Sequence, residues 1–287
     1  MTAILLSLSM ILSVSRNLFS KNLSKFPFGS KDFFHLQALL FAFGAVTLFL
    51  FGSPTWSVPS PPTWMYACIY GGFLILAQWF YTLALGKGNT ALCSTVYSMG
   101  FVLPTLSGAI VWAEPFSFLD LVGILCAIAA ILCSKDFSKE KTNTGKGCFL
   151  PLMIATISSG GLGILQKMQQ SSDVADERAA FLIIAFLLAS LLSFFTSLTT
   201  QKKKKHRPSY QAFALSAGVG IAFSACNLLN TILAGQLPSA IFFPTLNIGV
   251  ILMTLLSGLL FFKEHLRRKE ISVLIFGALS ILLLNIS

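Results

Sequence analysis

Long apolar runs separated by short polar breaks occupy almost the whole of this 287-residue chain. Most runs are close to the roughly 20 residues that a helix needs to cross a hydrocarbon core of about 30 Å. The runs are continuously apolar, whereas barrel strands alternate, and lipid offers no hydrogen-bond partner to an open strand edge. The pattern therefore predicts ten membrane-spanning helices, at residues 3–19, 33–52, 64–85, 91–113, 118–133, 149–166, 179–198, 210–234, 240–262 and 271–286.

The composition agrees with this prediction, because 55% of the residues are hydrophobic and only 10% are charged, against about 25% charged in an average soluble domain. The first run starts at Met1 with no basic segment before it and no signal-peptidase-like exit after it, so we expect a retained span. We predict an all-α integral membrane protein of the cell (inner) membrane, in contact with the lipid bilayer. The sequence leaves open whether it is a monomer or a homodimer.

The net charge of +10 would suit a nucleic-acid partner, but the basic residues lie in short clusters between apolar runs. No aromatic platform or folded module that reads bases accompanies them, so we expect no nucleic acid and assign the clusters to lipid headgroups and topology. The six cysteines form no CxxC pair, and five fall inside apolar runs, where cysteine behaves as a small hydrophobic residue. We expect neither a metal site nor a cofactor.

The polar breaks repeat along the chain. A shift of 150 residues places Glu114 on Glu264 and the Ser-Gly pair at 107–108 on the same pair at 257–258. We interpret the two glutamates as markers of equivalent helix ends. An odd number of spans per copy makes the second copy enter the membrane from the opposite side, and such inverted repeats are an architecture of secondary transporters, with the site near the midplane between the halves. The predicted repeats are residues 1–141 and 146–287, with five spans each.

Lysine and arginine concentrate in the odd-numbered connections between spans, including the run "KKKKHR" at 202–207. Because positively charged loops stay in the cytoplasm, this distribution predicts cytoplasmic odd-numbered connections and two external termini.

Four segments resemble the drug/metabolite transporter superfamily, specifically its ten-span, exporter-like (EamA-like) members with two five-span repeats. The segments are "NLFSK", "LALGKGNTA", "LSGAIVWAEPFSFLDLVGILCAIAAILC" and "LSGLLFFKEHLRRKEISVLIFGALSILLLN". The resemblance implies a solute carrier that works by alternating access. It also implies cytoplasmic termini, contrary to the loop charges, so the sidedness stays open. Relatives are associated with amino acids, nucleotide sugars, drugs and S-adenosylmethionine exchange, so the resemblance does not fix the substrate.

Uncharged polar side chains in the middle of spans are the first candidates for substrate binding. They lie three residues apart on one helical face, or at equivalent positions of the two repeats, so both repeats can present them to one cavity. Trp79 is a candidate for a different reason, because it can supply a flat face for an aromatic, adenine-like or cationic solute. The alternative is that these groups only hydrogen-bond between helices. The candidates are Gln78, Trp79, Tyr81, Tyr97, Asn227, Asn230 and Asn247.

The ionisable candidate is Arg16, three residues before the end of the first span. A guanidinium can hold a carboxylate or phosphate through two parallel hydrogen bonds, or it can extend to the membrane interface. Pro104 and Pro244 each free a backbone carbonyl within a span and are hinge candidates, although static kinks have the same cause. We expect Glu114 and Glu264 to be solvated anchors at helix ends rather than proton-coupling groups.

The function that these features favour is secondary transport of a small organic metabolite by alternating access, through exchange or facilitated diffusion. The preferred substrate is an amino acid or derivative, such as an S-adenosylmethionine-like solute, and the alternative is a drug or toxic-compound exporter. A membrane-embedded enzyme would carry catalytic groups such as H-E-x-x-H, and the sequence has none, so we predict no catalytic residue and no enzyme. A channel would need filter segments or charged rings.

Overall fold

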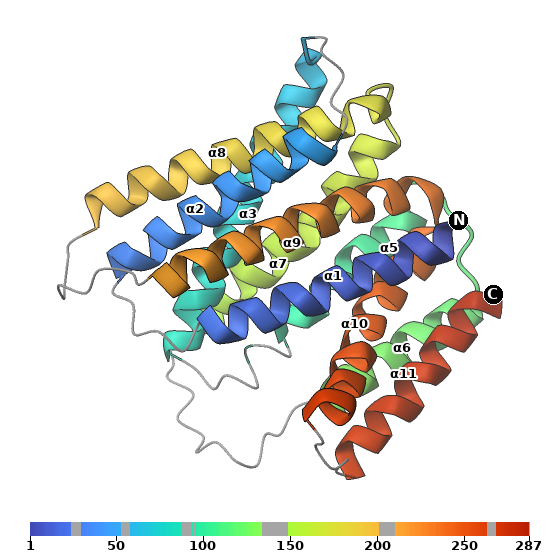
Figure 1. The fold of residues 1–287 in the computed structure, drawn as a ribbon. Coiled ribbons are helices and arrows are strands. Elements are labelled where there is room, and N and C mark those ends of the chain that lie inside the picture. The colour runs from blue at the N-terminus through green and yellow to red at the C-terminus, as the bar shows by residue number, and fades with distance from the viewer. Residues whose placement is uncertain are drawn as a thin grey trace. The chain divides into compact units, whose positions relative to one another are not determined.

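The computed structural model describes residues 1–23, 30–52, 58–87, 93, 96–133, 149–200, 210–262 and 268–286. All regular structure in these ranges is helical (Figure 1), so the prediction of an all-α fold is confirmed. Two short 3-10 turns, η1 (Met99–Phe101) and η2 (Ala175–Glu177), accompany the α-helices. The ten α-helices in the described ranges are α1 (Thr2–Leu23), α2 (Ser30–Phe51), α3 (Pro61–Lys87), α5 (Val102–Val111), α6 (Phe118–Cys133), α7 (Phe149–Gln170), α8 (Arg178–Thr199), α9 (Tyr210–Gln236), α10 (Ser239–Phe262) and α11 (Arg268–Ile286).

Several helices have the length and apolarity that a membrane span requires. In the described ranges, five stretches meet both conditions: Thr2–Ser20, Asp32–Phe51, Phe149–Gln170, Ala175–Thr199 and Tyr210–Gln236. Shorter apolar helices follow at Val96–Val111, Phe118–Cys133, Ser239–Met253 and Ile271–Leu284. These helices give the chain the character of a membrane protein, while the ten-span arrangement stays a prediction.

The helix that contains the sixth predicted span ends four residues later than expected, at Gln170 instead of Gln166. Amide side chains of its last turn bind the connection that follows, since Gln169 donates through Nε2 to the carbonyl of Val174 at 2.7 Å and Gln170 donates to that of Ala175 at 3.0 Å. These bonds satisfy two backbone carbonyls beyond the helix and attach the connection to the end of α7. The predicted span ends where mostly polar residues follow, whereas the backbone of the helix continues through them to Gln170.

The fourth predicted span contains a change of helix type. Residues 96–98 are helical, η1 follows, and α5 then runs to Val111. Pro104 has no N–H to donate to the carbonyl four residues earlier, which belongs to Gly100 in η1. The 3-10 turn therefore lies where the proline removes an α-helical bond. Pro244 lies inside α10, which stays α-helical around it.

The chain divides into two compact units, and each takes helices from both halves of the sequence. Unit 1 comprises Met1–Ile75 and Met168–Leu233, and unit 2 comprises Leu76–Lys167 and Ala234–Ser287. These units are spatial groupings, so they differ from the predicted sequence repeats at 1–141 and 146–287, and those repeats stay a prediction.

In unit 1, α2 packs along α8 and against α9. The Ser190 hydroxyl of α8 donates to the carbonyl of Ala38 at 2.8 Å, and the Ser216 hydroxyl of α9 donates to that of Leu36 at 2.7 Å. Gly220 of α9 lies so close that a Cβ there would be 2.2 Å from the carbonyl oxygen of Leu40. Small residues and hydroxyls therefore bring three backbones together, as in other membrane helix contacts.

In unit 2, α6 packs along α11, and α10 contacts α5, α6 and α11. The Ser280 hydroxyl of α11 donates to the carbonyl of Gly123 in α6 at 2.8 Å. A Cβ at Gly163 of α7 would lie 2.8 Å from the ring of Pro104 in α5. Pro104 is therefore packed directly against a neighbouring helix.

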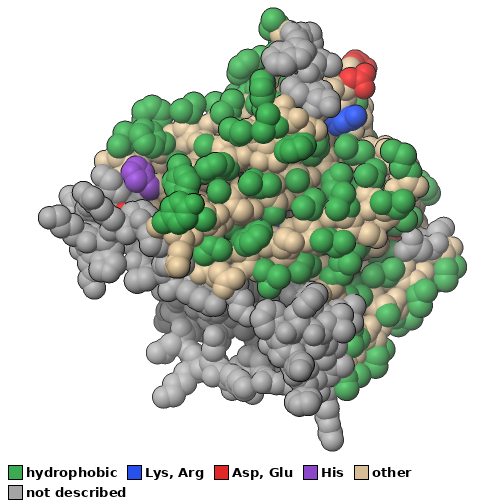
Figure 2. Space-filling model, viewed as in Figure 1, with side chains coloured by type: hydrophobic (Ala, Val, Ile, Leu, Met, Phe, Trp, Pro, Cys, Tyr) green, Lys and Arg blue, Asp and Glu red, His purple; other side chains and the backbone are tan. Residues whose placement is uncertain are grey.

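Large apolar side chains cover much of the outer surface. Figure 2 shows hydrophobic side chains spread over the described part of the face that is turned to the viewer, with charged side chains near its edge. Large exposed apolar patches are rare on soluble proteins. A hydrocarbon environment would remove the cost of this exposure. On α8 the exposed residues are Leu187, Leu191, Leu192, Phe194, Phe195 and Leu198, and on α2 they are Val46, Phe49, Leu50 and Phe51.

Candidate functional site

A polar cluster joins α1 to α9 inside unit 1 and contains two predicted site residues. The Ser9 hydroxyl of α1 donates to Oδ1 of Asn230, and Ser13 Oγ lies 2.9 Å from Sγ of Cys226. Nδ2 of Asn230 in turn contacts that sulfur at 3.4 Å. We use the name α1–α9 cluster for Ser9, Ser13, Arg16, Phe223, Cys226, Asn227 and Asn230.

Asn227 serves mainly as a contact between helices. It is buried, and its Oδ1 accepts a hydrogen bond from the hydroxyl of Tyr70 in α3 at 2.6 Å. Its Nδ2 donates to the carbonyl of Phe223 one turn earlier, at 2.8 Å. Both ends of the amide are therefore bonded, as a buried polar group requires. This geometry agrees with the helix-bonding alternative for Asn227.

Arg16 lies beside an aromatic ring in the same cluster. Its guanidinium carbon is 4.8 Å from the centroid of the Phe223 ring, a cation–π distance. Its Nη2 reaches Oδ1 of Asn17 at 3.5 Å, the limit of a hydrogen bond. The ion pair found among the described residues joins Lys167 to Glu114 and does not include Arg16. Arg16 therefore has no carboxylate partner there and can offer donors to an anion.

The predicted site residues on α3 belong to unit 2. Tyr81 stacks on Tyr97 with 4.3 Å between ring centroids and 32° between ring planes. Both rings are half-buried against a small core that contains Cys93. Gln78 and Trp79 are exposed instead. The sequence predicted that Gln78 and Tyr81 share one helical face. In the structure Gln78 is exposed, whereas Tyr81 is half-buried.

Asn247 lies in α10, also in unit 2, and donates through Nδ2 to the carbonyl of Phe243 at 2.9 Å. This bond runs back to its own helix. Glu264, the second predicted repeat-end marker, lies outside the described residues.

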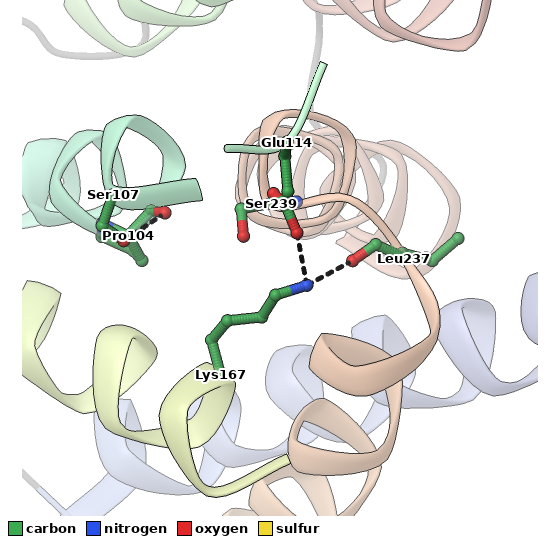
Figure 3. A network of polar contacts seen from close by, with 6 residues as sticks. All are labelled: Pro104, Ser107, Glu114, Lys167, Leu237 and Ser239. Carbon is green, nitrogen blue, oxygen red and sulfur yellow. Dashed lines mark hydrogen bonds and ion pairs between the residues drawn. The ribbon is translucent and has the colours of Figure 1, made fainter. Parts of the chain in front are cut away.

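The strongest electrostatic feature of unit 2 was not predicted as a pair. Figure 3 shows the ammonium of Lys167 in α7 between the carboxylate of Glu114 and the carbonyl of Leu237. Nζ lies 2.5 Å from Oε1 of Glu114 and donates to the Leu237 carbonyl at 3.3 Å. The other carboxylate oxygen accepts the backbone N–H of Ser239, the first residue of α10, at 2.7 Å. Glu114 thus neutralises a buried cation and caps a helix.

This geometry corrects one prediction. We expected Glu114 to be solvated, but its side chain is only 14% exposed and that of Lys167 only 9%. Its position between α5 and α6 is as predicted, and it does anchor a helix end. A lysine at the end of a span and a glutamate in a connection are visible in the sequence, but their pairing depends on how α7 and α10 pack.

The end of α5 directs Glu114 toward Lys167. The backbone N–H groups of Trp112 and Glu114 both donate to the carbonyl of Gly108, at 3.2 and 3.1 Å. Ala113 between them has φ of 48°, in the left-handed region that ends many helices. A Cβ at Gly108 would lie 2.3 Å from Oε2 of Glu114, so the glycine makes room for the carboxylate.

The remaining polar residues of this connection start the next helix. The backbone N–H of Ser117 donates to Oδ2 of Asp120 at 2.7 Å, and the N–H of Asp120 donates to the Ser117 hydroxyl at 3.2 Å. This reciprocal pair is a capping box at the start of α6. The stretch "WAEPFSFLD" therefore interrupts two apolar runs because Glu114, Ser117 and Asp120 each satisfy a helix end.

Replacing Ala113 with glycine is expected to stabilise the protein by about 0.5–1 kcal/mol. An alanine in the left-handed region carries a steric cost of roughly 1–2 kcal/mol, and part of this gain is lost because glycine has more freedom in the unfolded chain. The measurement is the free energy of unfolding in mixed micelles. Replacing Ala109, which is inside α5, with glycine is the matched control and should destabilise by about 1 kcal/mol. Equal effects at both positions would contradict the role of the turn.

Comparison with known proteins identifies the fold but no family. No family model matches the chain, and no curated protein matches it. A solved structure described as "Crystal structure of protein" has a TM-score of 0.77 and 14% sequence identity, over 98% of this chain and 95% of that chain. At this identity the likeness concerns the fold alone, and it extends over nearly the whole length of both chains.

Proposed function

We propose that this protein is a secondary transporter of a small organic metabolite and works by alternating access between two inverted five-helix repeats in the cell membrane. The observation that carries the proposal is the pairing of helices within each compact unit. α2 packs along α8 in unit 1, and α6 packs along α11 in unit 2. These are the second and fifth helices of the two predicted repeats. Each pair therefore joins equivalent helices, as an axis relating two inverted repeats would produce.

Contacts between connections give independent support to the ten-span topology. In unit 1, Oε2 of Glu177, before α8, accepts the N–H and hydroxyl of Ser60, before α3, at 3.0 and 2.9 Å. In unit 2, Lys167 and Glu114 join the end of α7 to the connection after α5 and to the start of α10. All these residues belong to even-numbered connections or adjoin them. Ten spans would place all even-numbered connections on one side of the membrane, where such contacts are possible.

The polar residues suit a solute rather than an ion alone. The α1–α9 cluster combines a cation, hydroxyls and amides, and Arg16 has no carboxylate partner among the described residues. Tyr81 and Tyr97 offer stacked aromatic faces in unit 2. Within unit 1, Arg16 suits a carboxylate, and within unit 2 the tyrosine pair suits an apolar or aromatic group. We therefore favour an amino acid or a derivative, such as an S-adenosylmethionine-like solute, within a carrier that resembles the drug/metabolite transporter superfamily.

Counter-flow in proteoliposomes tests the proposal. Vesicles loaded with an unlabelled solute should accumulate the labelled solute transiently, because only a carrier with alternating access shows trans-stimulation. The panel contains amino acids, nucleosides, S-adenosylmethionine and organic cations. Counter-flow of organic cations alone would favour the drug exporter, and leakage without trans-stimulation would contradict a carrier.

Variants of Arg16 test whether this residue takes part in solute binding. Replacing Arg16 with glutamine should lower the counter-flow of a carboxylate-bearing solute about tenfold or more, since a charge-assisted hydrogen bond contributes roughly 1.5–3 kcal/mol. Replacing it with lysine retains the charge and should cost less. Unchanged counter-flow in both variants would remove Arg16 from the site.

A further inference from the structure

The place where Lys167 meets the start of α10, here called the Lys167–Ser239 corner, has more donors than its present contacts use. The ammonium has three N–H groups, and the structure assigns one to Glu114 and one to the Leu237 carbonyl. The backbone N–H of Ser239 binds Glu114, but the Ser239 hydroxyl is fully buried and has no partner among the described residues. A buried hydroxyl without a partner is unfavourable.

The donors of the Lys167–Ser239 corner are buried, whereas the Glu114 carboxylate that they bind comes from a connection with exposed residues. Lys167 is buried within α7, and Ser239 is buried at the start of α10, so the donors are fixed on helices. Glu114 is instead delivered by the connection after α5, in which Ala113, Pro115 and Phe116 are exposed. Figure 3 shows its side chain reaching from that connection to the ammonium. The carboxylate therefore comes from a connection with exposed residues, whereas the donors belong to buried residues of two helices.

We propose that the Lys167–Ser239 corner is a carboxylate-binding site for the transported solute, separate from the one that Arg16 would provide, and that Glu114 occupies it as an internal substitute in the state described here. This inference rests on the proposed transport function for its role. The ammonium carries one positive charge, and the start of α10 adds about half a charge, which together match one carboxylate better than a doubly charged phosphate.

The donor count agrees with this choice of ligand. After the bond to Leu237, the corner offers three donors to a carboxylate in the place of Glu114: two ammonium N–H groups and the N–H of Ser239. A carboxylate has two oxygens with about four acceptor positions. When one carboxylate replaces another, the charge of the corner does not change, so the exchange avoids the large cost of an unpaired buried cation.

Anion binding to the purified full-length protein in detergent micelles tests the proposal, with acetate as the probe at constant ionic strength and acetamide as the neutral control. The glutamine in Glu114→Gln can still accept the N–H of Ser239 but carries no charge. We expect this variant to bind acetate at least about tenfold more tightly than the wild type, because an internal competitor at millimolar or higher effective concentration is removed. Acetamide should show no such gain.

The double variant Glu114→Gln/Lys167→Met identifies the binding place and should lose the gain. Equal acetate binding by the wild type and Glu114→Gln, or equal binding by the single and double variants, would overturn the proposal. If Glu114→Gln is unfolded without acetate, refolding on acetate addition supports the site, and unfolding that persists at high acetate counts against it. If the wild type shows counter-flow but Glu114→Gln does not bind acetate more tightly, this inference alone is refuted. If Glu114→Gln binds acetate more tightly but the wild type shows no counter-flow, the proposed transport alone is refuted.

Discussion

Replacing Glu114 with alanine is expected to lower the free energy of unfolding by about 3 kcal/mol. The variant leaves the ammonium of Lys167 in a place where its side chain is only 9% exposed, with the Leu237 carbonyl as its remaining partner. Removing one member of a buried ion pair typically costs roughly 3–5 kcal/mol, because the other charge stays buried. The start of α10 also loses its cap at Ser239. Unfolding in mixed micelles, in buffer without carboxylates, measures the effect.

Lys167→Met is the matched variant and should cost less, about 1–2 kcal/mol. In this variant the carboxylate of Glu114 loses its ion-pair partner. The cost is smaller because Glu114 lies in a connection with exposed neighbours and can turn toward water. In the double variant Glu114→Ala/Lys167→Met no buried charge remains, so the loss should be smaller than the sum of the single losses by at least about 1 kcal/mol. Strict additivity would show that the two side chains do not interact.

Replacing Gly220 with alanine should cost about 2–3 kcal/mol, the second large effect. The added Cβ would lie 2.2 Å from the carbonyl oxygen of Leu40 and 3.3 Å from the nitrogen of Gly44. These are backbone atoms of α2, so the contact can be relieved only by moving α9 away from α2. Forcing extra volume into a packed interior costs roughly 1–3 kcal/mol. Thermal or denaturant unfolding in micelles measures the loss.

Gly72 provides the control, because a Cβ at this position in α3 would meet nothing within 4 Å. Gly72→Ala should be neutral or stabilising by up to about 1 kcal/mol, since alanine favours a helix more than glycine does. If Gly220→Ala were as stable as Gly72→Ala, the close contact between α2 and α9 would be refuted.

Hydropathy alone located most of the helices, because each apolar run must satisfy its backbone internally in lipid. The exceptions have local causes. Polar residues do not end a helix by themselves, so α7 runs on to Gln170, and the fourth predicted span contains a 3-10 turn before Pro104. The apolarity of a residue indicates whether it is favourable in lipid. It does not indicate at which residue the backbone hydrogen bonds of a helix end.

The candidate site was less predictable. The sequence pointed to Asn227, Asn230 and Arg16 as polar residues in or near spans, and the structure supplies their partners on other helices. Tyr81 and Tyr97 were chosen for their own positions, and only packing brings their rings together. Side chains within one helix can be placed by its period of 3.6 residues. Contacts between helices depend on which helical faces pack together. A helix that is apolar on all sides does not specify which of its faces will contact a neighbour.

The sequence by itself determined that this chain is helical and suited to a membrane, because a composition with 55% hydrophobic and 10% charged residues, in runs of this length, fits few other folds. It also placed Glu114 at a helix end. Only the tertiary structure decided that this glutamate is buried, because its ion pair with Lys167 and its bond to Ser239 join segments that are far apart in the sequence. A carboxylate is solvated or paired according to what packs beside it, and packing is a property of the folded chain.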